Sequence, residues 1–162
     1  MAQERQRGVA FAKTTRPVIG SAVRRERLFA RMDGSPGRTL VWISGPNGAG
    51  KSTLAASYIE ARNYACIWYQ VDPDDADVAT FFHYLGHAAR RLDAGRSREL
   101  PAFTPQHSGD VAAFARNFFR QLFMHVKSPV VLVLDNLHEV SANSPLHTAL
   151  EAGLAQVPGH CC

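Results

Sequence analysis

Apolar residues along the chain alternate between two kinds of spacing, one typical of strands and one typical of helices. Continuous apolar runs rich in β-branched and aromatic residues predict strands over 39–44, 64–71 and 129–134. Apolar positions that recur every three or four residues predict helices over 23–32, 51–62, 77–92, 110–126 and 145–157. Strands that alternate with helices favour an α/β fold with three α/β/α layers, a parallel sheet and right-handed crossovers.

Polar segments mark the ends of these elements. Asp33–Gly37 is a turn cluster, and residues 93–108 are rich in Gly, Pro and Ser, which predicts a loop. The acidic residues of 72–77 are expected to form a solvated turn, with Asp77 capping the next helix. Residues 1–20 lack apolar periodicity, so we expect a flexible leader followed by one domain over 21–162.

Charge is unevenly distributed. The net charge is +4, but residues 1–31 hold eight Lys and Arg against Glu4 and Glu26. The bases are not interleaved with aromatic residues, and no helix-turn-helix or zinc-finger pattern follows them, so we expect no DNA-binding module in this chain.

The composition also bears on the cellular setting. No apolar run approaches the roughly 18 residues that a membrane span needs, so no membrane partner is expected. Three cysteines do not make a disulfide framework, which fits a reducing, cytoplasmic location.

The segment Gly45–Ser52 fits the phosphate-binding pattern G-x-x-x-x-G-K-[ST]. Its glycines let successive backbone N–H groups point at phosphate oxygens, and the start of the next helix adds a positive dipole end. Lys51 supplies a cation for the β- and γ-phosphates, and the Ser52 hydroxyl is placed to bind Mg²⁺. The expected nucleotide-contacting residues are Gly45, Pro46, Asn47, Gly48, Ala49, Gly50, Lys51, Ser52 and Thr53. This loop predicts binding of a nucleoside triphosphate.

A carboxylate ends the last predicted strand. Asp135 follows an apolar run and is expected to hold Mg²⁺ opposite Ser52, so Lys51 and Asp135 are the candidate catalytic residues. The next residue, Asn136, stands where hydrolases of this class commonly carry a second acid, and an amide accepts no proton at neutral pH. We expect Glu139 to face solvent, whereas His138 either contacts phosphate or a water molecule, or makes a structural hydrogen bond.

Three pairs of segments together resemble the amino-terminal ATPase domain of large LuxR-type transcriptional regulators of the maltose-activator type. These regulators are signal-transducing (STAND) NTPases related to AAA+ proteins. The segments are Lys13–Pro17 with Val23–Leu28, Ile67–Asp72 with Phe81–Leu85, and Leu132–His138 with Pro145–His147.

The resemblance implies a P-loop NTPase that binds ATP or ADP with Mg²⁺ as a switch module. Asn136 departs from the family's usual second Asp, so we expect hydrolysis to be slow or absent. The resemblance places Val23 and Arg25 beside the adenine and ribose. It also implies a further strand after Pro158-Gly159, ending in a γ-phosphate-sensing arginine, between the phosphate-loop strand and the Asp135 strand. We therefore expect a fold that is incomplete at its C-terminus, with open strand edges and with the chain as a truncated product.

Two other classes of function stay open: a P-loop enzyme of a different class, either an ABC-type ATPase or a small-molecule kinase, and a non-catalytic protein. The loop also resembles that of ABC transporter ATPases, but no L-S-G-G-Q stretch lies between Lys51 and Asp135. A small-molecule kinase would need a lid with paired arginines, which Arg90, Arg91, Arg96 and Arg98 would supply. Alternatively, the chain is non-catalytic and self-associates, or associates with a full-length relative, through its strand edges.

Overall fold

The computed structural model describes residues 12–20, 23–34, 40–92, 100–124 and 130–158. Its helices are α2 (Glu26–Asp33), α3 (Lys51–Arg62), α4 (Val78–Arg90), α5 (Val111–Met124) and α6 (Pro145–Leu154). Its strands are β1 (Ala65–Gln70) and β2 (Val130–Asp135), and its short 3₁₀ helices are η1 (Pro73–Ala76), η2 (Pro105–His107) and η3 (Leu137–Glu139). In this described part of the chain, no helix combines the length and apolar character needed to cross a membrane.

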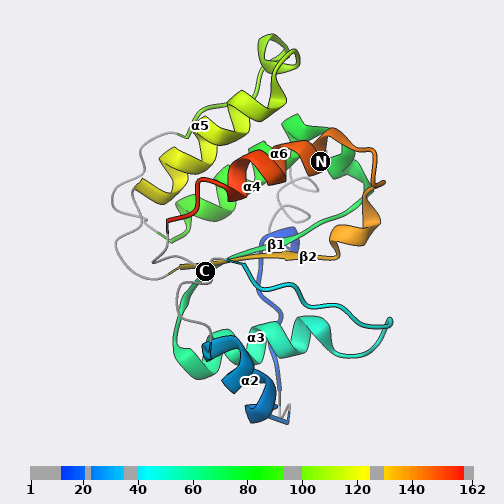
Figure 1. Cartoon of the computed structure of the whole chain (residues 1–162), viewed down its shortest axis with the longest axis vertical. Helices are drawn as coiled ribbons and strands as arrows, with labels where there is room; N and C mark the ends of the chain where they lie inside the picture. Colours follow the sequence, from blue (N-terminus) through cyan, green and yellow to red (C-terminus); the bar gives the residue numbers. More distant parts are fainter. Residues whose placement is uncertain (1–11, 21–22, 35–39, 93–99, 125–129, 159–162) are drawn as a thin grey trace, which may run out of the picture.

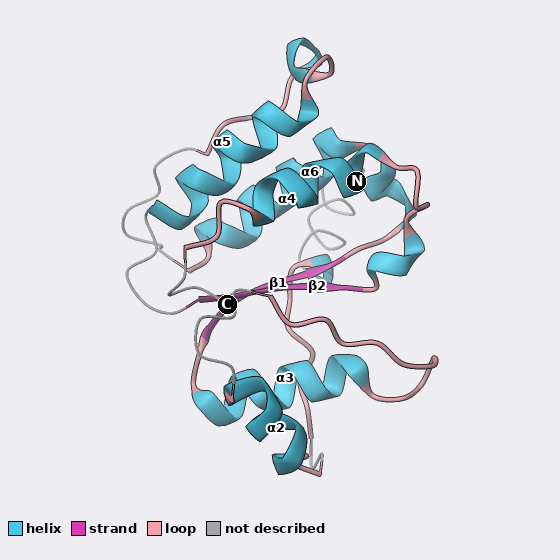
Figure 2. Cartoon of the chain, viewed as in Figure 1, coloured by secondary structure: helices cyan, strands magenta, loops and turns pink. Residues whose placement is uncertain are grey.

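The sheet lies between two layers of helices, with α2 and α3 on one side and α4, α5 and α6 on the other (Figures 1 and 2). β1 and β2 pair in parallel, from Ala65 opposite Val130 to Gln70 opposite Asp135. The predicted three-layer α/β arrangement with a parallel sheet is confirmed, and both strands lie within a residue or two of their predicted limits.

Successive side chains of β1 face opposite layers, as the period of a strand requires. Ile67 and Tyr69 are buried in the core formed with α4, α5 and α6. Trp68 points to the other face and packs with Ala56 and Ile59 of α3. Because both faces are covered, the strand is apolar from Ala65 to Tyr69 rather than alternating with polar residues, and it ends in the exposed Gln70.

Polar side chains begin the helices as the sequence predicts. Asp77 accepts a hydrogen bond from the Ala79 N–H at the start of α4, at 3.2 Å. Ser144 caps α6 in the same way, directly before Pro145 at the first helical position. These caps satisfy N–H groups that a helix cannot satisfy internally, and they fix where α4 and α6 begin.

The predicted strand over 39–44 is wrong for residues 40–44, which form no strand. Leu40, Val41 and Trp42 are exposed, with 57%, 44% and 73% of their surface accessible. A strand requires a neighbour that pairs with its N–H and C=O groups, and among the described residues β1 and β2 pair with each other. Apolar composition alone therefore did not determine the backbone conformation here.

Aromatic rings fill the core above β1. The Phe82 ring of α4 lies 4.8 Å from the Phe114 ring and 4.9 Å from the Phe118 ring, measured between centroids. Phe114 and Phe118 belong to α5. The ring of Phe119, in the same helix, lies against Gly153 of α6, where a Cβ atom would overlap it. Helices α5 and α6 therefore pack at a distance that only glycine permits at this position.

A buried cation joins the N-terminal segment to the end of β1. Lys13 is 5% exposed, and its Nζ lies 2.8 Å from the carboxylates of both Asp72 and Asp75. The ammonium group also lies 5.4 Å from the ring centroids of Tyr69 and Tyr84. Lys13 belongs to the segment 1–20, which we expected to be a flexible leader, and it is buried. Residues 1–11 of that segment lie outside the described residues.

Asp75 is fully buried, which corrects the expectation of a solvated turn at this position. Its Oδ1 accepts a hydrogen bond from the Tyr69 hydroxyl at 2.6 Å, and its Oδ2 accepts one from the Asp72 N–H at 2.9 Å. Burial, followed by the hydrogen bond to Asp75, raises the pKa of Tyr69 above its ordinary value. Asp77 caps α4 as predicted, and Asp72 also caps a helix, the short η1.

Candidate nucleotide-binding site

The loop 45–50 leads directly into α3 and depends on its glycines. Gly48 and Gly50 both have φ of +78°, in the left-handed region that residues with a Cβ adopt at a cost. The Ala49 N–H donates to the Pro46 carbonyl at 3.2 Å, which closes a turn within the loop. Two glycines of the predicted phosphate-binding pattern therefore take conformations that depend on the absence of a Cβ.

Lys51 lies across the loop that precedes it. Its Nζ donates hydrogen bonds to the carbonyl oxygens of Gly45 at 2.9 Å and Pro46 at 3.1 Å. These contacts hold the ammonium group over the loop, where it adds positive charge next to the exposed N–H groups.

The N-terminus of α3 is open to an anion. Gly50 is its N-cap residue, and no side chain caps the helix. The first N–H groups of an α-helix have no partner within the helix, so those of Lys51, Ser52 and Thr53 remain available. A phosphate group fits such a position because it accepts these N–H groups and matches the positive end of the helix dipole.

Ser52 and Asp135 meet although they are far apart in sequence. The Ser52 hydroxyl donates to Asp135 Oδ1 at 2.9 Å, and the same oxygen accepts the Asn136 N–H at 3.1 Å. Ser52 comes from the first turn of α3 and Asp135 from the last residue of β2. The hydroxyl and carboxylate oxygens are hard donors of the kind Mg²⁺ prefers, so the pair fits that ion.

The described residues hold no group of three or more His, Cys, Asp or Glu side chains able to bind a metal. A Mg²⁺ ion at Ser52 and Asp135 would therefore take its remaining ligands from phosphate oxygens and water, as Mg²⁺ commonly does in phosphate sites.

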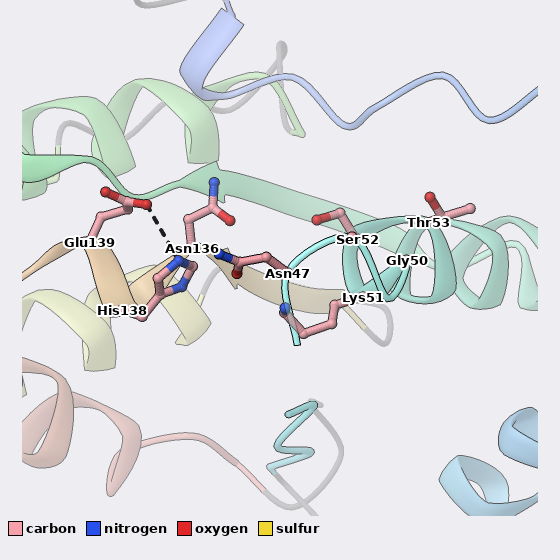
Figure 3. A pocket seen from close by; sticks show the side chains of 9 residues that line it. Asn47, Gly50, Lys51, Ser52, Thr53, Asn136, His138 and Glu139 are labelled. Carbon is pink, nitrogen blue, oxygen red and sulfur yellow. Dashed lines mark ion pairs between the residues drawn. The ribbon is translucent and has the colours of Figure 1, made fainter. Parts of the chain in front are cut away.

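Lys51 and Ser52 line a pocket of about 480 Å³, whereas Asp135 is not among its lining residues (Figure 3). Its walls come from the loop, the first turn of α3 and the segment after β2. The lining residues are Asn47, Gly48, Gly50, Lys51, Ser52, Thr53, Asn136, His138 and Glu139. The structure thus places most of the predicted phosphate loop, together with Asn136, around one pocket.

The far wall of the pocket is formed by the turn after β2. Asn136 has φ of +60°, which turns the chain from β2 into η3. Asn adopts this left-handed conformation more readily than most residues. The turn brings His138 and Glu139 to the pocket, where His138 Nε2 lies 3.3 Å from Glu139 Oε1. Glu139 is half exposed and so faces solvent as expected. It also lines the pocket, a position that the sequence did not predict.

Val23 and Arg25 lie outside the pocket lining. Arg25 donates a hydrogen bond to the Ala49 carbonyl at 3.3 Å, so it contacts the outer side of the loop. Val23 is 85% exposed, in the segment that leads to Arg25. The loop 45–50 and the segment 23–25 are therefore neighbours, although neither the Val23 nor the Arg25 side chain lines the pocket.

Sequence comparisons with known proteins cover nearly the whole chain. A sequence family described as the AAA ATPase domain matches residues 17–157. The chain is 31% identical over 155 residues to the HTH-type transcriptional regulator MalT of Cronobacter sakazakii (strain ATCC BAA-894). That match covers 92% of this chain and 16% of the relative. The resemblance drawn from the sequence is confirmed by both findings.

Proposed function

The chain belongs to the AAA ATPase domain family, and from this premise we propose that it is the ATP-binding switch module of a LuxR-type transcriptional regulator. Its ligands are ATP and ADP with Mg²⁺. The chain corresponds to 16% of the length of MalT, and the proposal concerns this part alone. A cytoplasmic location is part of the proposal.

One observation carries the proposal: the 2.9 Å contact between Ser52 and Asp135 at the edge of a pocket that also contains Lys51. A serine after a Gly-Lys pair and an acid at the end of a parallel strand are the two residues that hold Mg²⁺ in P-loop proteins. The contact brings them together across 83 positions of sequence. A glycine-rich turn with no ligand would not require this contact.

Each residue has a definite task in binding. The N–H groups of Lys51, Ser52 and Thr53 bind phosphate oxygens at the start of α3. Lys51 exchanges its loop carbonyl partners for phosphate oxygens, because a charged acceptor binds an ammonium group more strongly than a neutral carbonyl does. Ser52 and Asp135 hold Mg²⁺, which neutralises phosphate charge when bound.

Hydrolysis is slow in this proposal because of Asn136. Its side chain lines the pocket next to Asp135, but an amide cannot take a proton from the attacking water at neutral pH. Binding can then persist without rapid turnover, which suits a module whose ATP and ADP forms signal different states.

Of the alternatives, the kinase lid finds no support among the described arginines. Arg91, after α4, donates to the Thr14 carbonyl and the Thr15 hydroxyl rather than to the pocket. Arg96 and Arg98 lie outside the described residues. Association with a second copy or with a full-length relative is retained as part of the proposal, because β2 has one described neighbour, β1.

A thermal melt with and without Mg²⁺-ATP or ADP tests the proposal. At a ligand concentration a hundred times the Kd, binding to the folded form adds about 2.7 kcal/mol and raises the midpoint by roughly 5–10 °C. Lys51→Ala should melt close to the wild type without ligand, because the hydrogen bonds of the Lys51 ammonium group among the described residues go to carbonyls of the exposed loop, and should gain little from nucleotide. Equal shifts in the two proteins, or none in the wild type, would contradict the proposed site.

A further inference from the structure

We infer that His138 is a specificity residue that contacts the third phosphate of a nucleoside triphosphate, so that the site binds ATP more tightly than ADP. The inference rests on the proposed function and deepens it, because it names a group that separates the two ligands. Under that proposal the loop and the first turn of α3 bind the phosphates that ATP and ADP share. A contact made by ATP alone therefore has to come from another wall of the pocket.

The pocket has such a second wall, formed by the segment after β2. Three residues of the segment 136–139 line it from this side, and the other lining residues fall within 47–53. Figure 3 shows the His138 ring across the pocket from the first turn of α3. The hydrogen bond from Ser52 to Asp135 joins the two walls, because Asp135 directly precedes the segment 136–139.

The third phosphate of ATP belongs on the side of this second wall. In P-loop proteins the loop N–H groups hold the inner phosphates, and Mg²⁺ bridges oxygens of the second and third. Ser52 and Asp135 are the proposed Mg²⁺ ligands, and the Ser52 hydroxyl lies 2.9 Å from the Asp135 carboxylate. A phosphate that shares this ion lies near Asp135, where the segment 136–139 begins. ADP has no group at this position.

The backbone holds His138 at the pocket. Leu137 packs against the core formed with α4, α5 and α6, and Val140 is buried in that core with 4% of its surface exposed. Between them the Glu139 N–H donates to the Asn136 carbonyl at 2.9 Å and closes the turn of η3. Since the residues on both sides are fixed by the core, His138 and Glu139 are left on the outer side of the turn, where they line the pocket.

His138 is a hydrogen-bond donor whose partner can be replaced. Its Nε2 lies 3.3 Å from Glu139 Oε1, and a ring nitrogen that faces a carboxylate is the one that carries a proton. The two side chains are 57% and 47% exposed, so water weakens their attraction. A phosphate group carries more negative charge than a carboxylate and takes over this N–H, whereas an ionised Glu139 has no proton to donate.

Calorimetric titration of His138→Ala with ADP and with the non-hydrolysable β,γ-imido analogue of ATP, both with Mg²⁺, tests the inference. The Kd for the analogue should rise about tenfold, as expected for the loss of one hydrogen bond to a charged group, and that for ADP should stay within about twofold. His138→Gln keeps an N–H donor near the position of Nε2 and should recover about threefold of the loss. Equal losses for both ligands, an unchanged Kd for the analogue, or a glutamine variant no better than alanine would overturn the inference.

Two further variants make the test specific. His83→Ala is the matched control, because it removes an exposed histidine of α4 that does not line the pocket, and it should change neither Kd. Glu139→Gln removes the carboxylate that competes for His138, so the analogue should bind about threefold more tightly, the size of an exposed charge interaction, with ADP unchanged. The same loss in His83→Ala as in His138→Ala, or no gain in Glu139→Gln, would contradict a direct contact.

The remaining outcomes separate the possible failures. His138 is exposed, so His138→Ala should melt like the wild type without ligand, and if it does not fold, Glu139→Gln decides. A wild-type chain that bound both ligands with equal affinity would overturn the role of His138 alone. A wild-type chain that bound neither would contradict the proposed function itself.

Discussion

Asn136 combines two properties that bear on chemistry. Its φ of +60° lets the chain turn from β2 into η3, which brings His138 and Glu139 to the pocket. Its amide side chain, however, cannot act as a general base at neutral pH. Asp tolerates the same backbone conformation as Asn, so an acid can be placed here without a change of fold.

Asn136→Asp should therefore raise steady-state ATP turnover by about a hundredfold, the lower range for a positioned general base. The increase should disappear when Lys51→Ala is added, because the phosphates would no longer be held. Asn136→Gly is the matched control, since it accepts a positive φ and adds no acid. Turnover in Asn136→Asp no higher than in Asn136→Gly would show that position 136 does not limit hydrolysis.

Cys66 is a residue whose reactivity the fold suppresses. Burial raises the pKa of its thiol from 9.0 to about 11, against a small opposing effect of Arg16. At pH 8 the thiolate fraction is then roughly a hundredfold lower than in the unfolded chain, and the thiolate is the form that reacts. The folded state holds the proton more tightly, so this contribution to stability is present below pH 9 and is lost as the pH rises towards 11.

In a Cys161→Ser/Cys162→Ser background, iodoacetamide at pH 8 should thus alkylate Cys66 about a hundredfold more slowly in the folded protein than in denaturant. Alkylation followed by mass spectrometry measures both rates. Similar rates in the two conditions would show that the Cys66 thiol is not shielded.

Among the helices, the closest fit is between α5 and α6. Gly153→Ala should destabilise the fold by about 1–3 kcal/mol or more, because its Cβ would overlap the fully buried ring of Phe119. Gly86→Ala in α4 is the matched control: its Cβ would lie 3.9 Å from the Phe118 ring, an ordinary contact. The control should be neutral or up to about 1 kcal/mol more stable, as expected for alanine in a helix. Urea unfolding compares the two, and equal midpoints would contradict the proposed clash.

Elements with strong local signals were predictable, and the segment that depends on a partner was not. The helices α3, α4 and α6 begin where capping residues or the Gly-Lys pair predict, because these signals act within one turn. Residues 40–44 have the composition of a strand but no neighbour to pair with among the described residues. Strand formation is a property of two segments, and one sequence window contains only one of them.

The same distinction applies to the site. The loop residues Gly48, Gly50 and Lys51 were found from spacing, because the phosphate-binding pattern is local. The buried Lys13–Asp75 pair was missed, since its partners are far apart in sequence and each looks like a solvated charge. A basic residue two positions before Thr15 carried no signal of burial without the acids of the distant turn.

Among the residues that the structure describes, the sheet separates two cores of unequal size. The core between β1 and α4–α6 contains a large set of buried aromatic and aliphatic side chains, whereas the one beside α3 centres on Ala56, Ile59 and Trp68. The proposed nucleotide site includes the first turn of α3, on the side with the smaller core. Regions with fewer buried contacts open more readily, and sites that respond to ligands are commonly built there.

The two tryptophans of the chain occupy contrasting surroundings in this arrangement. Trp42, three positions before Gly45, is 73% exposed, whereas Trp68 in β1 is 3% exposed. A water-soluble quencher such as iodide reaches the first indole and not the second, so the quenchable part of the intrinsic fluorescence belongs to Trp42. The unlabelled chain thereby carries an optical reporter beside its phosphate loop and an internal reference within its sheet.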